Sequence, residues 1–378
     1  MNVKKSSQPV FHLGYRPAIN GLRGFAVLWV MAFHFNLPLG RDGIFGVDMF
    51  FAISGFLISI LLIEEYEKNK KIRLLDFYIR RILRLYPALL CMLIAVVFFV
   101  PRAYIISTLF YFTNWIKALH LQPESLYLDH TWSLSIEEQF YLIWPVLLMI
   151  LLRSKLPRKV LFVFPASLGL ISAFSRVCIW NSTQDWFRVY MGTDLHADGL
   201  LLGSALGLQT AYTDPSYFNK HKMVNTLITV LSFTLLAWLL IEKQMDRSFI
   251  PIAGNLLVSL ITLVILYRLV LAPSQLIIKI LSFPLLVKIG VISYGLYLWH
   301  SPIGAWIDLG KSSINPIFLG YIKILLTCFI ATISYVFVEK PFLKLKNRYS
   351  PNKSECTVES SESNSPKQSI LEVQDSLK

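Results

Sequence analysis

Ionisable residues inside apolar stretches are the first sign of chemistry in this sequence, because each is costly in lipid unless it faces a polar cavity or a partner. His34 lies near the end of the first apolar stretch, and Asp48 lies near the start of the second. We expect the two at similar depth, so that the Asp48 carboxylate orients the His34 imidazole for general-base chemistry. The alternative for His34 is a structural hydrogen bond, and for Asp48 a helix cap beside Gly46.

Two adjacent acids, Glu137 and Glu138, interrupt a later apolar stretch with the sequence HTWSLSIEEQFYLIWP. Ser133, Glu137 and Tyr141 are spaced by four residues, which places them on one face of a helix. At 1.5 Å per residue, Glu137 lies about 12 Å from the outer end of that helix. We therefore expect it to share a cavity with His34. The alternative is a hydrogen bond or ion pair that holds helices together.

Arginines gather at the other end of these stretches. Arg80, Arg81 and Arg84 lie close together in FYIRRILRLYP, with Arg81 and Arg84 on one helical face. Arg23 precedes His34 by eleven residues, or about 16 Å along a helix. Because guanidinium groups bind phosphate bidentately, these arginines form a candidate clamp for a phosphate-rich substrate from the cytoplasm. The alternative is an ordinary basic cluster at a membrane boundary.

Other polar residues carry weaker signals. Asp194, His196 and Asp198 do not share one helix face, so we expect no metal site there. His300, in YGLYLWHSPI, either bonds a neighbouring helix or belongs to the cavity, and Glu339 fits a boundary charge. The four cysteines show neither a CxxC pair nor metal-ligand spacing, so we expect no disulfide framework and no zinc site.

Composition indicates which elements must position these residues. The chain has 378 residues, of which 55% are hydrophobic and 16% charged, against roughly 25% charged in soluble proteins. Its mean hydropathy is +0.56, which predicts an all-α polytopic membrane protein. The net charge of +13 suggests a nucleic-acid partner by its sign alone. The placement of the basic residues favours membrane topology instead, with the lipid bilayer and no nucleic acid as a partner.

Ten apolar stretches are long enough to cross a bilayer as helices. Their approximate ranges are 18–36, 43–63, 82–100, 130–152, 159–180, 194–212, 223–242, 250–271, 284–307 and 316–338. Of the 36 lysines and arginines, 25 lie in the terminal segments and every second loop, and 7 lie in the other loops. Positive loops stay cytoplasmic, so we expect both termini in the cytoplasm and the chain in the cytoplasmic (inner) membrane.

The domain organisation predicted from composition is simple. Residues 1–348 form one membrane-embedded domain, and residues 349–378 form a cytoplasmic tail that is too rich in serine and too poor in aromatic residues to bury a core. The sequence contains neither G-x-x-x-x-G-K-[ST] nor G-x-S-x-G. A nucleotide-driven pump and an α/β-hydrolase therefore have no support.

The motifs together resemble the acyltransferase-3 family of integral membrane O-acyltransferases. The resemblance covers roughly residues 15–342 and rests on RPAINGLRGFAVLWVMAFHF, GVDMFFAISGFLIS, RRILRLYP, HTWSLSIEEQFYLIWP, DLHADGLLLG, ISYGLYLWHSPI and FVEKPF, in the order usual for the family. The family's Arg-x10-His pattern falls on Arg23 and His34. One departure is His196, where many relatives have arginine. Another is that the chain has no extracytoplasmic esterase-like domain, which some relatives carry, so acceptor recognition is expected from the membrane domain or a partner.

The resemblance implies transfer of an acyl group, commonly acetyl, from acyl-coenzyme A to a hydroxyl of a cell-surface glycan such as lipopolysaccharide O-antigen or exopolysaccharide. Acyl-coenzyme A is then a donor substrate, with no permanently bound cofactor. The donor-binding residues are Arg23, Arg81 and Arg84. The catalytic candidates are His34, Asp48, Glu137 and Glu138. A neutral His34 takes the acceptor proton, and Asp48 or Glu137 stabilises the resulting imidazolium.

Two other classes of protein fit part of the pattern. A transporter or flippase of an acyl or glycan intermediate also needs a polar cavity with intramembrane charges, but we find no inverted repeat in the sequence. A structural or sensory membrane protein explains poorly why so many ionisable residues point to one cavity. The acceptor, the acyl length, the oligomeric state and a direct or covalent mechanism are not indicated by the sequence.

Overall fold

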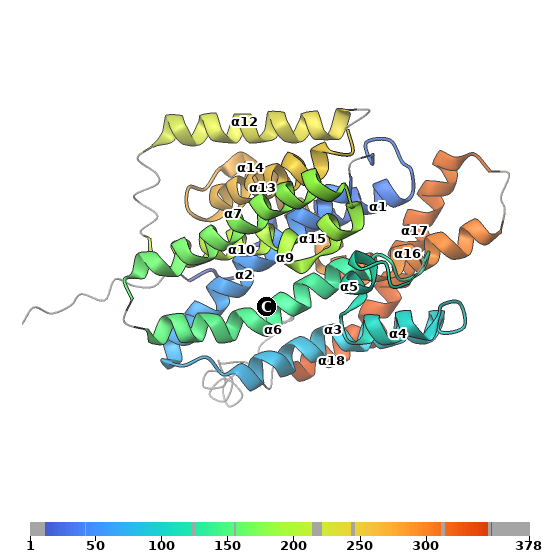
Figure 1. Cartoon of the computed structure of the whole chain (residues 1–378), viewed down its shortest axis with the longest axis horizontal. Coiled ribbons are helices and arrows are strands. Elements are labelled where there is room, and N and C mark those ends of the chain that lie inside the picture. Colours follow the sequence, from blue (N-terminus) through green and yellow to red (C-terminus); the bar gives the residue numbers. More distant parts are fainter. Residues whose placement is uncertain are drawn as a thin grey trace, which may run out of the picture.

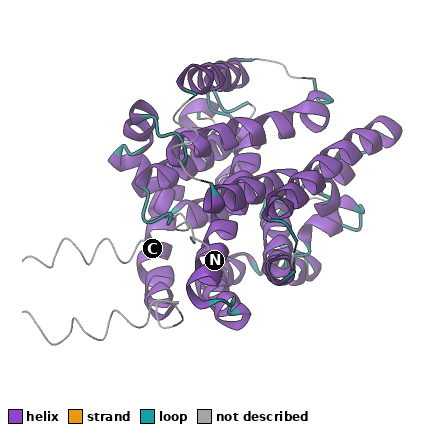
Figure 2. Cartoon of the chain, turned by 90° about the vertical axis from the view of Figure 1, so that its left-hand side faces the viewer, coloured by secondary structure: helices purple, strands orange, loops and turns teal. Residues whose placement is uncertain are grey.

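The computed structural model describes residues 12–41, 43–122, 125–154, 156–213, 221–242, 246–310, 314–346 and 349. Every regular element within these ranges is a helix (Figures 1 and 2). The all-α prediction is thus confirmed. The expected tail, apart from Tyr349, lies outside the described residues.

The helices follow one another along the chain with short connections. The first part contains α1 (Pro17–His34), η1 (Gly43–Phe45), α2 (Gly46–Asn69), α3 (Leu74–Val96), α4 (Arg102–Leu109), α5 (Thr113–Ala118), α6 (Thr131–Arg153) and α7 (Arg158–Thr183). The middle contains α8 (Trp186–Met191), α9 (Thr193–His196), α10 (Asp198–Tyr212), α12 (Lys222–Ile241), η2 (Ile250–Gly254) and α13 (Asn255–Val270). The last part contains α14 (Gln275–Leu281), α15 (Pro284–Val291), α16 (Ser293–Leu309), α17 (Pro316–Ser334), η3 (Tyr335–Glu339) and α18 (Lys340–Lys346).

Each of the ten predicted apolar ranges coincides with helix, but fewer are both long and apolar enough to cross a membrane. Within the described residues six such segments occur: Gly43–Asn69, Thr131–Arg153, Arg158–Thr183, Lys222–Ile241, Ile250–Val270 and Pro316–Leu345. The other predicted ranges fall short because α10 and α16 have 15 and 17 residues, and α3 is rich in arginine. The chain is a multi-pass membrane protein. Ten crossings and the cytoplasmic termini stay predictions.

The contact between α1 and α15 is unusually close because glycines line it. A Cβ atom added to Gly24 would lie 2.3 Å from the Leu286 carbonyl oxygen. One added to Gly290 would lie 1.7 Å from the Asn20 carbonyl oxygen. Small residues allow membrane helices to approach at backbone distance. The first half of α1 is therefore held at backbone distance from α15.

Helices α2 and α10 meet in the same way. A Cβ atom on Gly55 would lie 1.9 Å from the Leu200 carbonyl oxygen, and one on Gly203 would lie 2.1 Å from that of Ala52. This packing fixes which face of α2 turns toward α10 and α13. The start of α2, including Asp48, is consequently buried on that side.

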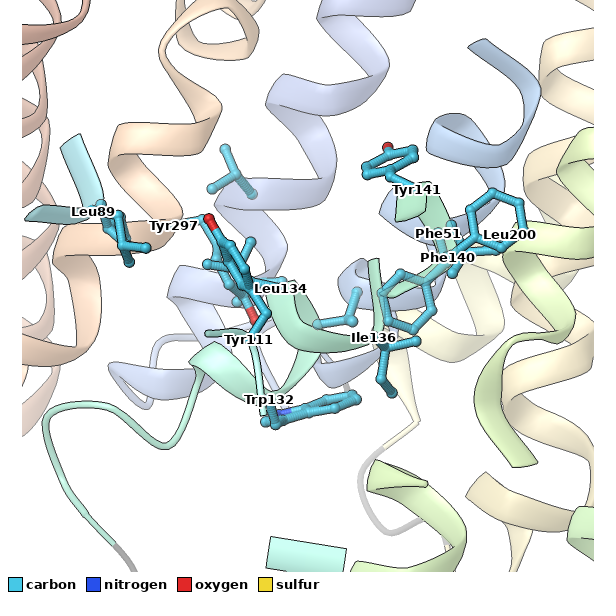
Figure 3. Close-up of a cluster of buried hydrophobic side chains, with 14 of the residues drawn as sticks. Phe51, Leu89, Tyr111, Trp132, Leu134, Ile136, Phe140, Tyr141, Leu200 and Tyr297 are labelled. Atoms are coloured by element: carbon cyan, nitrogen blue, oxygen red, sulfur yellow. The ribbon is translucent and has the colours of Figure 1, made fainter. Parts of the chain in front are cut away.

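The outside of the bundle is apolar, as a bilayer requires. Helix α12 lies at the periphery (yellow in Figure 1), and only 22% of its apolar stretch is buried inside the protein. The main buried cluster lies deeper and mixes aromatic and aliphatic side chains, including Phe51, Trp132, Tyr141 and Tyr297 (Figure 3). Two of these residues, Tyr141 and Tyr297, carry hydroxyl groups into the site described next.

Candidate active site

A first group of polar side chains, the arginine–glutamate cluster, is assembled by α1, α2, α3 and α6. Its members are Arg23, Ser54, Arg81, Arg84, Glu137, Glu138 and Tyr141. The Tyr141 hydroxyl donates to Glu137 Oε1 at 2.6 Å, and the Ser54 hydroxyl donates to the same oxygen. The Arg81 guanidinium lies over the Tyr141 ring, 3.3 Å from its centroid. The predicted shared face of Ser133, Glu137 and Tyr141 is thus confirmed for the last two.

The three arginines of this cluster are grouped without being neutralised in direct pairs. Arg23 lies within electrostatic range of Arg84, Glu137 and Arg81. Within the described residues none of these arginines forms an ion pair, and Arg81 Nε is buried without a hydrogen-bond partner. All three remain partly accessible. Guanidinium groups held together in this way are suited to an anionic ligand that bears several phosphates.

Arg80 differs from its neighbours. Its guanidinium pairs with Glu65 at 3.0 Å and donates to the Tyr349 carbonyl oxygen at 2.7 Å. It therefore ties α3 to α2, while Arg81 and Arg84 face the cluster. The role of Arg81, Arg84 and Arg23 in binding a donor stays a prediction.

Glu339 also belongs to this end of the site. The sequence suggested a boundary charge, yet its side chain is 5% exposed and interacts electrostatically with Arg84. It ends the π-helical turn η3, and its Oε1 has no hydrogen-bond partner among the described residues. Such turns occur frequently at functional sites. The FVEKPF motif of the family includes Glu339 and so indicated that this residue is part of the site. The apolar pattern alone indicated only a charge at the end of a helix.

A second group, the histidine cluster, consists of His34, His130, Tyr297 and His300. The His34 and His300 rings meet edge to face with centroids 4.8 Å apart, and the His130 and His300 centroids are 5.0 Å apart. His34 is exposed, whereas His130 and His300 are 4% and 0% exposed. The hydroxyl groups of Tyr297 and Ser133 are 2.5 Å apart and form a hydrogen bond. The Tyr297 hydroxyl also lies 3.0 Å from the His130 carbonyl oxygen, to which it can donate.

His34 has the orientation of a general base. Its Nδ1 lies 2.9 Å from the Val30 carbonyl oxygen. A carbonyl oxygen only accepts hydrogen bonds, so Nδ1 carries the proton and Nε2 presents its lone pair. The Glu137 carboxylate reaches this cluster only through the electrostatic effect that it exerts on Tyr297. Glu137 and His34 thus belong to two connected groups rather than to one hydrogen-bonded set.

Asp48 does not orient His34, which corrects the predicted pairing. Its Oδ1 lies 2.8 Å from His196 Nε2 and accepts from Asn255 Nδ2 at 3.0 Å. The packing of α2 on α10 and α13 turns Asp48 away from α1. Equal depth in the membrane was predicted from the sequence, but the direction of the side chain around the helix axis was not.

Asp48 belongs instead to a buried ion network with His196, Arg176 and Asp198. The Arg176 guanidinium donates to both Asp198 oxygens, at 2.8 and 2.9 Å. His196 Nδ1 lies 2.5 Å from the Tyr190 carbonyl oxygen. His196 Nε2 also lies 2.9 Å from Asn255 Nδ2, so the side chains of Asp48, His196 and Asn255 meet at one point. The network thus joins a guanidinium and an imidazole to two buried carboxylates.

The sequence analysis missed several residues of these groups. Arg176 lies within the predicted range 159–180, and its complete burial marks it as structural. Ser54 and Tyr297 lie in the quoted motifs GVDMFFAISGFLIS and ISYGLYLWHSPI, which were the available sign of their role. His130 directly precedes α6 in the quoted HTWSLS motif, which was the one available sign of its role.

Comparison with known proteins gives a consistent picture. The family model Acyl_transf_3, an acyltransferase domain, matches residues 16–337. The chain is 36% identical to a peptidoglycan O-acetyltransferase OatA of Listeria monocytogenes, over 87% of this chain and 56% of the relative. It is 36% identical to a putative O-acetyltransferase of Staphylococcus aureus strain MSSA476, over 91% of this chain and 60% of the relative.

A third relative, an O-acetyltransferase OatA of Staphylococcus aureus strain NCTC 8325, is 35% identical over 90% of this chain and 59% of its own length. The chain therefore spans less than two thirds of the length of these relatives. No solved structure matches the chain significantly.

Proposed function

The chain belongs to the acyltransferase-3 family, and from this membership we propose that it transfers an acetyl group from acetyl-coenzyme A to a hydroxyl of a cell-surface glycan. The sequence led us to expect lipopolysaccharide O-antigen or exopolysaccharide as the acceptor. The name of the Listeria monocytogenes relative favours peptidoglycan instead. We accordingly propose a peptidoglycan-type glycan as the acceptor and the cytoplasmic membrane as the location.

The observation that carries this proposal is the arrangement of two unlike polar groups along α1. Arg23 belongs to the arginine–glutamate cluster, and His34 belongs to the histidine cluster. Eleven residues separate them, which is about 16 Å of helix. A donor with phosphates at one end and a thioester at the other end of an extended arm matches this arrangement. The arginines bind the phosphates, and the arm carries the thioester toward His34.

In the proposed reaction His34 acts as the general base. Its Nε2 takes the proton of the acceptor hydroxyl while that oxygen attacks the thioester carbonyl carbon. A carbon–oxygen bond forms, the carbon–sulfur bond breaks, and its electron pair leaves with the sulfur. The proton passes from His34 to the thiolate, so that coenzyme A leaves as the free thiol. A positioned base of this kind contributes roughly 10²–10⁴-fold to a rate.

The test uses the full-length protein in proteoliposomes with radiolabelled acetyl-coenzyme A and purified peptidoglycan glycan strands. We expect the wild type to acetylate the strands, His34→Ala to bind the donor without reacting, and Arg81→Ala/Arg84→Ala to lose donor binding. Arg73→Ala is the matched control, because this exposed arginine on the same side contacts only Asp76 at 3.5 Å. Movement of labelled material across the membrane without covalent change would indicate a transporter and contradict the proposal.

A further inference from the structure

The second imidazole beside His34 has a geometry that the proposed reaction leaves unused. We infer that His300 is the positioning partner of His34 and accepts a hydrogen bond from the protonated His34 ring during proton transfer. This inference deepens the proposed function. It gives His300 the stabilising role that the sequence analysis assigned to Asp48.

The hydrogen bonds of His300 define its tautomer. Its Nδ1 lies 2.5 Å from the Tyr297 carbonyl oxygen. Since that oxygen only accepts, Nδ1 carries the proton and Nε2 keeps its lone pair. His300 Nε2 is buried and has no hydrogen-bond partner among the described residues. A buried acceptor without a donor costs free energy. A donor that appears only during the reaction would therefore form a favourable hydrogen bond with this nitrogen.

The nearest source of such a donor is His34. The two ring centroids are 4.8 Å apart, with the rings meeting edge to face. When His34 Nε2 takes a proton, the ring becomes a cation with a new N–H group. In the inferred interaction this N–H group donates to His300 Nε2 in the adjacent ring. The proton remains bound to His34 and later leaves with the coenzyme A thiol, so His300 is unchanged at the end.

No acid among the described residues is placed to stabilise protonated His34 in place of His300. Among the described residues, no carboxylate forms a hydrogen bond or ion pair with any member of the histidine cluster. Lys323, on the neighbouring α17, lies 5.7 Å from the Phe35 ring centroid. It forms an ion pair with Asp308 at 2.6 Å, so the Asp308 carboxylate already has a partner. His130 and Tyr297 contact the His300 ring. The other rings that contact the two histidines are apolar, Phe33 against His34 and Phe35 against His300.

Burial separates the roles of the two histidines. His300 is 0% exposed, whereas His34 is exposed. A substrate hydroxyl reaches His34 and not His300. His300 therefore acts through His34, which makes it a positioning residue rather than a catalytic one.

The first experiment measures this coupling without any substrate. Diethyl pyrocarbonate modifies neutral imidazole, and mass spectrometry of the full-length protein in proteoliposomes gives the rate at His34. On the acid limb of the pH–rate profile, where most of the His34 ring is protonated, we expect His300→Phe to raise that rate about fivefold, which is the change in proton affinity that one hydrogen bond supplies. His300→Gln retains an acceptor and should stay near wild type. His120→Phe is the matched control, because this exposed histidine lies outside both clusters and contacts Asp185, and it should leave the rate at His34 unchanged.

The second experiment measures turnover with acetyl-coenzyme A and peptidoglycan strands. We expect His300→Phe to lower kcat roughly ten- to a hundredfold, the range for a hydrogen bond to a charged group, with KM for the donor unchanged. His300→Gln should recover much of the rate. Equal losses in both variants, or unchanged labelling of His34 in His300→Phe, would overturn the inference. Coupled labelling without acetyl transfer would support the histidine pair and count against the proposed function alone.

Discussion

The buried ion network and the two clusters of the candidate site use the same residue types in opposite ways. In the network, Arg176 faces Asp198 and His196 faces Asp48, and all four side chains are at most 1% exposed. In the arginine–glutamate cluster the arginines form no ion pair within the described residues, and they remain partly accessible. Charges that are paired and dry hold helices together, whereas grouped charges with open valences are available to a ligand.

The largest effect that tests this difference between the site and the network is expected at His34. His34→Ala should reduce acetyl transfer roughly 10²–10⁴-fold, while the thermal unfolding midpoint stays close to that of the wild type because the ring is exposed. Transfer assays and differential scanning fluorimetry in the same detergent check the two halves. An unfolded variant would place His34 among the structural residues.

The next largest effect is expected in the network. Arg176→Met leaves the Asp198 carboxylate buried without its partner, which should cost about 3–5 kcal/mol of stability. Chemical unfolding in mixed micelles measures this loss. Arg153→Met, at the exposed end of α6, removes the same charge and is the control. Equal stability of the two variants would show that the network is not structural.

His196 sharpens the comparison further. Since the His196 side chain contacts Asp48 at 2.8 Å, His196→Arg retains a polar partner for Asp48 and should be tolerated better than His196→Leu. The leucine variant leaves Asp48 unpaired and should lose about 3 kcal/mol or more. Unfolding midpoints of the two variants, compared with the wild type, give the order. A leucine variant more stable than the arginine variant would show that the contact of His196 with Asp48 does not stabilise the network.

A smaller effect is expected inside the site. Tyr141→Phe removes one donor to the Glu137 carboxylate and should cost about 1.5–3 kcal/mol of local stabilisation. Because the Arg81 guanidinium lies over the same ring, the ring contact is retained. We expect a weakened affinity for acetyl-coenzyme A, measured by equilibrium binding. Unchanged binding would separate Glu137 from the donor site.

The smallest effect concerns a surface pair between α5 and α8. Burial alone would raise the pKa of Asp185, but hydrogen bonds from His120 and from the backbone N–H of Arg188 hold it below the ordinary value. This contribution is present above the ordinary carboxyl pKa and is lost as pH falls through the lowered pKa. His120→Ala should cost at most about 1 kcal/mol, measured as the unfolding midpoint at neutral and acidic pH. A larger loss would move this exposed pair into the structural class.

The sequence predicts features that depend only on position along the chain, such as the apolar ranges and the spacing of residues on one helix. Hydropathy located ten ranges that are largely helical, but it missed the short helices α4, α5, α8 and α14. A spacing of four residues placed Tyr141 beside Glu137. The prediction failed for Asp48 because depth along a helix does not define direction around its axis. The partner of Asp48, His196, is 148 positions away in the sequence, and only the glycine-lined packing of α2 against α10 brings the two together.

The glycine contact between α1 and α15 has a consequence for the choice of donor. With Gly24 and Gly290 pressed against backbone oxygens, the Arg23 end of α1 cannot slide along α15 without losing that fit, and about 16 Å of helix separates it from His34. The helix acts as a molecular ruler. A small activated acyl compound such as acetyl phosphate has an anion and a reactive carbon only a few bonds apart, and it cannot reach both ends of the ruler at once.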